Sequence, residues 1–301
     1  MKFSFGLPLM AHPQNPEFMT AEAIAEFARA AESAGFDSCS LTEHPLPNDR
    51  WLASGGHDAL DPFVALAVAA GATARLRLLT NLTPVPYRNP AILAKTVATL
   101  DRLSEGRLVV QPTVSWHRHE YDALGVPFAA RGAILDEQLE AMSALWAHTP
   151  ASHAGPRFAF EDVYCVPKPW RTDPARPRMW FGGQSMHPAL LRRLVRYGDG
   201  FHPFGAASGQ DLATLRAGLA AAGRDPDGIE MVGGTRAVFT GADETADIDA
   251  AMAGFGDQIE AGFTTFCVKP SQHTDDPAEV RALCEHIVAR AAHLDAGARR
   301  A

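Results

Sequence analysis

Residues 76–116 read LRLLTNLTPVPYRNPAILAKTVATLDRLSEGRLVVQPTVSW, and this stretch predicts the fold of the whole chain. Two short apolar runs, 76–82 and 107–113, flank a segment, 91–106, whose apolar residues recur with helical spacing. A strand, a crossover helix and a second strand make a βαβ unit, in which the two strands run parallel. Their carboxyl ends therefore lie on one face, where we expect the chemistry.

The same alternation of strand and helix continues on both sides of this unit. Further strands are expected at 2–8, 38–43, 178–183, 199–203, 229–239 and 264–270, and further helices at 20–35, 61–74, 134–148, 188–198, 209–223, 244–262 and 277–294. Eight strands, each followed by a helix, predict an α/β protein with a (β/α)8 TIM barrel. We expect one domain over residues 1–301, with an insertion after the fourth strand at about 117–177 whose last part, 149–177, is an extended excursion.

Proline punctuates most of the expected strands at their carboxyl ends. It cannot donate a hydrogen bond to a sheet, so it ends a strand and fixes the loop that leaves it. Six of the eight strands meet one there: Pro8, Pro45, Pro84, Pro112, Pro203 and Pro270. In a TIM barrel these loops build the active site.

Composition narrows the function classes. The formal net charge of −8 argues against a nucleic-acid partner, which requires a basic face. No run approaches the ~20 apolar residues of a membrane span, and the N-terminus lacks a signal-like core, so we expect a cytoplasmic protein with a small-molecule substrate. The four cysteines are dispersed without a CxxC pair, and no GxGxxG, GxxxxGK[ST] or GxSxG motif occurs.

Polar residues collect where the strands end, and they form the candidate site. They are Glu43, His44, Asn81, Leu82, Thr83, Gln111, Thr113, Ser115, Trp116, Gly182, Gly183, Gln184, Ser185 and His202. A ring of amide, hydroxyl, indole and imidazole groups with few charges suits a large neutral aromatic ligand. Gly182 and Gly183 precede a helix, where backbone N–H groups bind phosphate.

Each of these residues also has a purely structural explanation. A histidine at a strand end is often a hydrogen-bonded structural residue, Gly182 and Gly183 suit a tight turn, and Trp116 suits a core or hinge position. The run RRLVR at 192–196 is expected to form the solvated face of a helix. A non-catalytic binding barrel therefore remains an alternative.

The cluster HRHE at 117–120 raises the alternative of a metal site. Two histidines spaced i, i+2 chelate zinc on a strand, but on a helix they point apart. We expect no metal site here. A metal-dependent barrel hydrolase that uses His44, His117, His119 and His202 remains the alternative from another class.

Several strings resemble one known family. SLTEHP at 40–45, TPVPYRNP at 83–90, KTVATLDRLSEGRL at 95–108, WHRHEYDALGVPFAARG at 116–132 and WFGGQSMHPALLRRLVRYGDGF at 180–201 are similar to the luciferase-like monooxygenase family of flavin and deazaflavin barrels. Within it the chain looks closest to oxidoreductases that use the deazaflavin coenzyme F420. The resemblance covers most of residues 1–205.

This resemblance implies a site and a reaction. It implies a cis peptide bond between Asn81 and Leu82 against the cofactor's central ring, Glu43 and His44 beside the reactive ring, and Gly182, Gly183 and Gln184 at the phosphate. Many relatives have a GxGxGW run where this chain has Gln111 to Trp116, including Thr113 and Ser115, so the side chains of this segment are expected to contact the cofactor or narrow the pocket.

The implied reaction is hydride transfer between F420 and a small organic substrate, with His44 as proton donor or acceptor. An FMN-dependent monooxygenase on the same barrel is the alternative. Basic residues beyond the phosphate would favour the poly-glutamate tail of F420, and Arg88, Arg118 and Arg131 are available. The resemblance also implies a homodimer.

Overall fold

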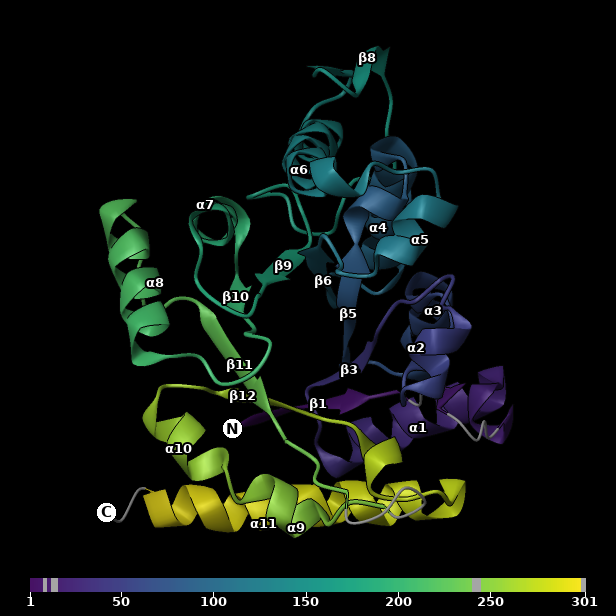
Figure 1. Ribbon diagram of the computed structural model, residues 1–301, viewed down its shortest axis with the longest axis vertical. Helices are drawn as coiled ribbons and strands as arrows, with labels where there is room; N and C mark the ends of the chain where they lie inside the picture. Colours follow the sequence, from purple (N-terminus) through teal and green to yellow (C-terminus); the bar gives the residue numbers. More distant parts are fainter. Residues whose placement is uncertain (8–9, 12–15, 240–244, 299–301) are drawn as a thin grey trace.

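The computed structural model describes residues 1–7, 10–11, 16–239 and 245–298. Within them, eight parallel strands close a barrel in the order β1-β12-β11-β10-β9-β6-β5-β3 (Figure 1). Their bounds are β1 (Lys2–Gly6), β3 (Ser38–Leu41), β5 (Arg77–Pro84), β6 (Leu108–Thr113), β9 (Arg178–Phe181), β10 (Gly200–Phe201), β11 (Glu230–Gly234) and β12 (Thr265–Val268). The predicted (β/α)8 barrel is confirmed.

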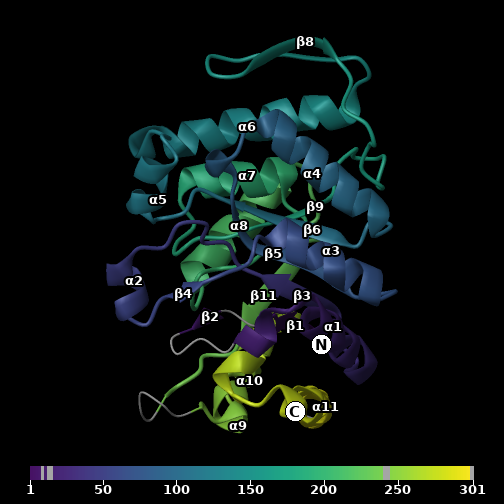
Figure 2. The same cartoon turned by 90° about the vertical axis from the view of Figure 1, so that its right-hand side faces the viewer.

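Helices alternate with these strands along the chain and surround the barrel (Figures 1 and 2). Their bounds are α1 (Ala21–Ala34), α2 (Asp49–Ala53), α3 (Pro62–Ala72), α4 (Pro90–Leu103), α5 (Arg118–Ala123), α6 (Arg131–Ala147), α7 (Pro188–Tyr197), α8 (Gly209–Ala221), α9 (Ile248–Met252), α10 (Phe255–Glu260) and α11 (Val280–Ala298). Among the described residues, no helix is both long and apolar enough to cross a bilayer.

Three predicted segments differ most from the structure. The helix expected at 244–262 is two helices, α9 and α10, because the chain turns at Gly254, a poor helix former; residue 244 itself lies outside the described residues. Strand β11 ends at Gly234 instead of 239. The excursion at 149–177 contains an antiparallel hairpin, β7 (Ala151–Ala154) with β8 (Ala159–Val163), which Figure 2 shows beyond α6.

Two further small elements, a helix and a two-stranded ribbon, lie within the first 58 residues of the chain. Helix α2 lies in the loop that follows β3, and strands β2 (Met10–Ala11) and β4 (His57–Asp58) pair as a short antiparallel ribbon. Of the strand-ending prolines, Pro84 and Pro112 are the last or next-to-last residues of their strands. Pro45, Pro203 and Pro270 follow theirs closely, and Pro8 lies outside the described residues.

The interior of the barrel is filled by side chains from four strands. Leu79, Val109, Trp180 and Val232 form one buried cluster, separate from the larger core between strands and helices. Trp180 fits there because its neighbour on β10 is Gly200, where a Cβ atom would lie 2.3 Å from the indole. The barrel is therefore a packed core, and ligands must bind at its mouth.

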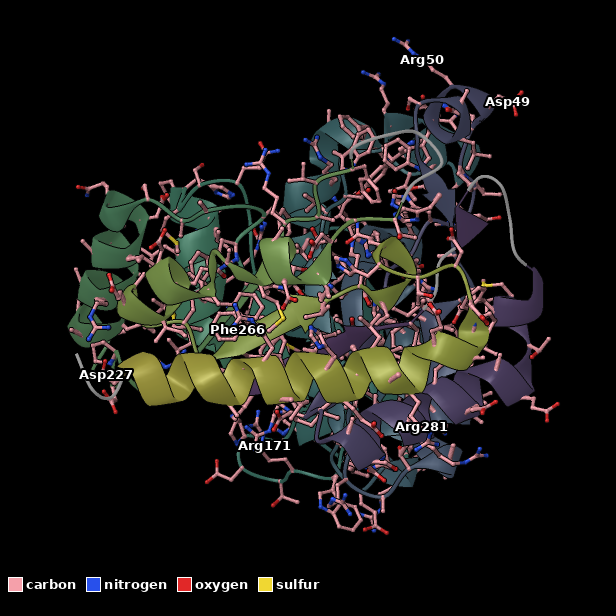
Figure 3. All side chains as sticks on the ribbon, turned by 90° about the horizontal axis from the view of Figure 1, so that it is seen from below. Asp49, Arg50, Arg171, Asp227, Phe266 and Arg281 are labelled. Carbon is pink, nitrogen blue, oxygen red and sulfur yellow. The ribbon has the colours of Figure 1, made fainter. Side chains whose placement is uncertain are left out.

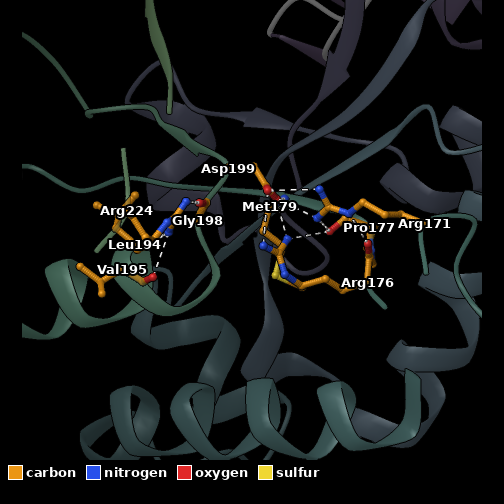
Figure 4. Close-up of polar contacts among 9 residues, drawn as sticks. All are labelled: Arg171, Arg176, Pro177, Met179, Leu194, Val195, Gly198, Asp199 and Arg224. Carbon is orange, nitrogen blue, oxygen red and sulfur yellow. Dashed lines mark hydrogen bonds and ion pairs between the residues drawn. The ribbon is translucent and has the colours of Figure 1, made fainter. Parts of the chain in front are cut away.

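A carboxylate anchors the chain where it returns from the insertion to the barrel. Asp199 accepts hydrogen bonds from Arg176 Nη1 at 2.5 Å, from Arg171 and from the backbone N–H of Met179 at 2.8 Å (Figure 4). Burial alone would raise the pKa of Asp199, but the hydrogen bond and charge of Arg176 lower it. These contacts fix the start of β9 against the start of β10.

We expect Asp199→Asn to destabilise the protein by roughly 2–4 kcal/mol, because it leaves two partly buried guanidinium groups without their counter-charge. The matched control is Asp227→Asn, which breaks an exposed pair with Arg216 and should cost about 1 kcal/mol or less. Urea denaturation followed by circular dichroism measures both. Equal losses in the two variants would contradict the anchoring role.

Candidate active site

A cavity of about 550 Å³ opens at the carboxyl ends of β3, β5, β6 and β9. Ten of the fourteen candidate residues line it: Glu43, His44, Leu82, Thr113, Ser115, Trp116, Gly182, Gly183, Gln184 and Ser185. Each follows or ends a barrel strand, because parallel strands carry their carboxyl ends to one face. The lining also includes Arg131, which was named for the cofactor tail, and two residues that sequence reasoning did not select, His187 and Arg193.

Asn81, Thr83, Gln111 and His202 do not line this cavity. The peptide bond between Asn81 and Leu82 is cis, as expected from the resemblance, and it places Leu82 in the lining. Gln111 is fully buried, and its Oε1 atom lies 3.0 Å from Nδ1 of His202. Burial, and then the charge of Lys269, lower the pKa of His202 to about 4, so this imidazole is neutral and its Nδ1–H donates to Gln111.

Glu43 is a buried carboxylate with a cationic partner. It accepts a hydrogen bond from Arg88, which also binds Asp61 at 2.8 Å. Burial raises the pKa of Glu43 to about 7, and the opposing effect of Arg88 does not cancel this shift. Arg88 is therefore committed to two carboxylates and is not available to bind a cofactor tail.

His44 is paired with a second buried carboxylate, Glu120. Nδ1 of His44 lies 3.5 Å from Oε1 of Glu120, and the Tyr87 hydroxyl donates to Oε2 of the same carboxylate at 2.7 Å. Burial alone would raise the pKa of Glu120, but the nearby His44 and the hydrogen bonds from Tyr87 and the Leu46 N–H lower it. Glu120 is therefore ionised at neutral pH and places a negative charge beside Nδ1 of His44.

Sequence reasoning did not assign Glu120 to the site and named it only within the cluster HRHE at 117–120. Helix α5 turns this residue inward, so that it is fully buried while Arg118 and His119 on the same helix are exposed. The only local signal is that Glu120 and the neighbouring Tyr121 are the two buried positions of α5.

Gly182 and Gly183 have different reasons to be glycine. A Cβ atom on Gly182 would lie 1.7 Å from the carbonyl oxygen of His202, so close packing of two strand ends excludes any side chain. Among the described residues, the backbone N–H groups of Gly183, Gln184 and Ser185 donate to no protein acceptor. These three N–H groups, next to the amino end of α7, are available to an anion.

Two arginines border the same end of the cavity. The run RRLVR was expected to be a solvated helix face, but Arg193 is buried and binds Asp136 at 2.6 Å, because α7 packs this position toward α6. Arg131 donates to the carbonyl of Phe128 from Nη1, and its buried Nε–H has no partner. An unpaired guanidinium N–H on a cavity wall favours an anionic ligand group.

The histidines near the mouth do not form a metal site within the residues that the structure describes, where no group of three or more His, Cys, Asp or Glu side chains is placed to hold an ion. His44 lies 5.2 Å from His57 and 5.8 Å from His117, measured between ring centroids. All four cysteines are free thiols. The mouth is thus an aromatic and imidazole-rich surface with two buried carboxylates.

A closed parallel barrel with a polar and aromatic cavity at the carboxyl ends of its strands has the layout of a TIM-barrel enzyme. The chain matches the luciferase-like monooxygenase family over residues 1–298, and it belongs to that family. The resemblance deduced from the sequence is confirmed. Members of this family are oxidoreductases and monooxygenases that act on small molecules.

Individual relatives match shorter segments. An uncharacterised protein of Mycobacterium tuberculosis is 36% identical over 162 residues, which cover 48% of this chain and 56% of that protein. The FMNH2-dependent dimethylsulfone monooxygenase of Pseudomonas fluorescens is 29% identical over 164 residues, or 53% of this chain and 42% of that enzyme. The matches thus span about half the length of these curated relatives.

A solved structure matches over almost the whole chain. The coenzyme F420-dependent tetrahydromethanopterin reductase of Methanopyrus kandleri superposes with a TM-score of 0.67, covering 94% of this chain and 97% of that enzyme. At 17% sequence identity this likeness shows the shared fold.

We expect the raised pKa of Glu43 to appear in the pH dependence of stability. Because its folded pKa of about 7 exceeds the unfolded value of 4.5, the folded state binds an extra proton between them. The stability of the wild type relative to Glu43→Gln should therefore fall by roughly 1–3 kcal/mol as pH rises from 4.5 to 7, and then level off. Urea titrations across this range measure it, and a constant difference would contradict the assignment.

Glu120 should show the opposite sign. Its pKa is lowered from 4.5, so its contribution to stability is present above that pH and is lost as pH falls through the folded value. We expect Glu120→Gln to lose roughly 1–3 kcal/mol at pH 7, because charged hydrogen bonds from Tyr87 and Leu46 are weakened, and to approach the wild type in acid. The control is Glu140→Gln, which removes an exposed pair with Arg196.

Proposed function

We propose that the protein transfers a hydride between the deazaflavin coenzyme F420 and a small organic substrate. The observation that supports this proposal is the anionic-ligand end of the cavity, where Arg131 has a buried unpaired Nε–H and Arg193 lies beside it. Three unpaired backbone N–H groups, those of Gly183, Gln184 and Ser185, lie at the same end.

The donor set fits a cofactor with a long acidic side chain. Backbone N–H groups next to α7 suit a phosphate, and the guanidinium of Arg131 suits a further negative group beyond it. Of the three arginines available to a poly-glutamate tail, Arg88 is bound to Glu43 and Asp61, and Arg118 is an exposed residue near Asp122. Arg131 is the one that lines the cavity.

The other end of the cavity suits a planar ring. Leu82, which follows the cis peptide bond, and the segment from Thr113 to Trp116 line it together with His44. We infer that Thr113 and Ser115 bind the cofactor through their side chains, and that Leu82 contacts its ring system. When bound there, a deazaflavin supplies hydride chemistry.

His44 is proposed to exchange the proton that accompanies hydride transfer. Glu120 lies 3.5 Å from Nδ1 and is ionised, so its negative charge favours the imidazole when that ring takes up a proton. Tyr87 holds Glu120 in place through the 2.7 Å hydrogen bond. The buried Glu43, partly protonated near pH 7, is a second proton carrier on the same wall.

An FMN-dependent monooxygenase is the second candidate, and the dimethylsulfone monooxygenase relative favours it. The same N–H groups near α7 would hold the FMN phosphate. FMN has no acidic tail beyond its phosphate, so Arg131 would contribute little to FMN affinity. This difference separates the two candidates.

The test is a titration of the purified protein with F420 and, separately, with FMN, followed by quenching of its five tryptophans. We expect F420 to bind at least tenfold more tightly, and Arg131→Gln to weaken F420 by about tenfold through loss of a charged hydrogen bond, with FMN little changed. Arg192→Gln, on an exposed position of α7, is the control. Preference for FMN would favour oxygen chemistry, and binding of neither would refute both candidates.

A further inference from the structure

A second cavity, of about 390 Å³, lies between α2 and the start of α5. We call it the outer pocket. Its lining includes Asn48, Arg50, Trp51, Trp116, His117 and Arg118, and Trp116 also lines the larger cavity. Figure 3 shows Arg50 at the outer edge of the molecule, so the outer pocket is reached from solvent. None of the functions discussed above uses it.

The outer pocket offers many hydrogen-bond donors and no carboxylate. The side-chain oxygen of Asn48 caps α2 by accepting a hydrogen bond from the backbone N–H of Trp51 at 2.8 Å. The side-chain NH2 group of Asn48 can therefore donate to a ligand. The indole Nε1–H of Trp51 is buried without a partner. Arg50 forms no ion pair among the described residues, and Arg118 has only a 3.8 Å contact with Asp122.

One buried imidazole adds a second unpaired polar atom to this wall. His117 is 4% exposed, lines the outer pocket, and has an Nδ1 atom without a hydrogen-bond partner. A buried polar atom left unpaired is costly, so a wall with two of them is completed by a ligand. Because guanidinium and indole N–H groups only donate, that ligand must bring acceptors, and two arginines favour an anion.

The walls of the outer pocket also favour an aromatic ligand. Trp51 and Trp116 meet edge to face, with ring centroids 5.2 Å apart and planes at 76°. Gly56 leaves room for the Trp51 indole, because a Cβ atom there would lie 2.4 Å from it. Two indoles arranged edge to face present one face and one edge to a planar guest.

The outer pocket is also close to the proposed proton carrier. The ring centroids of His44 lie 5.8 Å from those of both Trp51 and His117. A ligand that contacts Trp51 and Trp116 is therefore separated from His44 by the Trp51 side chain. Trp116 lines both cavities, so the same ligand also lies next to the larger cavity.

We propose that the outer pocket binds the substrate, and that the substrate is an aromatic compound with a carboxylate or a similar anionic group. The ring packs against Trp51 and Trp116, and the anion binds Arg50 and Arg118 with the N–H of Trp51. That the guest is the substrate rests on the proposed function. The same carboxylate chemistry exists in the glutamate tail of F420, and the experiment separates these two sources.

The probes are 2-naphthoate, its neutral analogue 2-naphthamide, and acetate, titrated calorimetrically into the full chain with and without saturating F420. We expect 2-naphthoate to bind at least tenfold more tightly than either control probe, because only it carries both ring and charge. Arg50→Gln and Arg118→Gln should each weaken 2-naphthoate about tenfold and leave 2-naphthamide unchanged. Arg216→Gln, an exposed arginine on α8, is the matched control.

Two results would overturn the proposal. Equal binding of 2-naphthoate and 2-naphthamide, or arginine variants that match the control, would show that the outer pocket does not recognise anions. Displacement of 2-naphthoate by F420 would assign the outer pocket to the cofactor tail, whereas joint binding supports the substrate. The titrations without F420 do not depend on the cofactor, so failure of F420 to bind leaves the anion test intact.

Discussion

Closure of the barrel is the constraint on which the rest of the structure depends. Strand β1 pairs with β3 on one side and with β12 on the other, so that Phe5 lies opposite both Cys39 and Val268. A closed ring of parallel strands has no edge and sends every carboxyl end to one face. Because Trp180 and its neighbours fill the interior, ligands are confined to the loops at that face.

Within that face, two buried carboxylates acquire opposite character from their surroundings. Glu43 has one cation, Arg88, which also serves Asp61, and burial outweighs this partner and raises the pKa to about 7. Glu120 accepts hydrogen bonds from Tyr87 and the Leu46 N–H, lies beside His44, and stays ionised. The same residue type therefore gives a carboxyl group with a raised pKa at one position and a negative charge beside His44 at the other.

The local pattern predicted the frame of this site but not its polar connections. Alternation of strand and helix around 76–116 was enough for the barrel, and strand ends were enough to select residues such as His44, Thr113 and Gly183. The inward turn of Glu120 depends on Tyr87, 33 residues away, and the burial of Arg193 on Asp136, 57 residues away. Periodicity carries no information about such distant partners, and it also missed the break at Gly254 between α9 and α10.

The two cavities are built from different parts of the fold: barrel strands line one, and loop helices line the other. The larger cavity is built mainly from strand ends, whose positions barrel closure fixes, which suits a cofactor shared across a family. The outer pocket is built from α2 and α5, which lie in the loop after β3 and in the insertion after β6. Loop segments change without disturbing the barrel, so chemistry that distinguishes one substrate from another belongs there. Trp116 lies between β6 and α5 and lines both cavities, so it would contact both a ring in the larger cavity and a guest in the outer pocket.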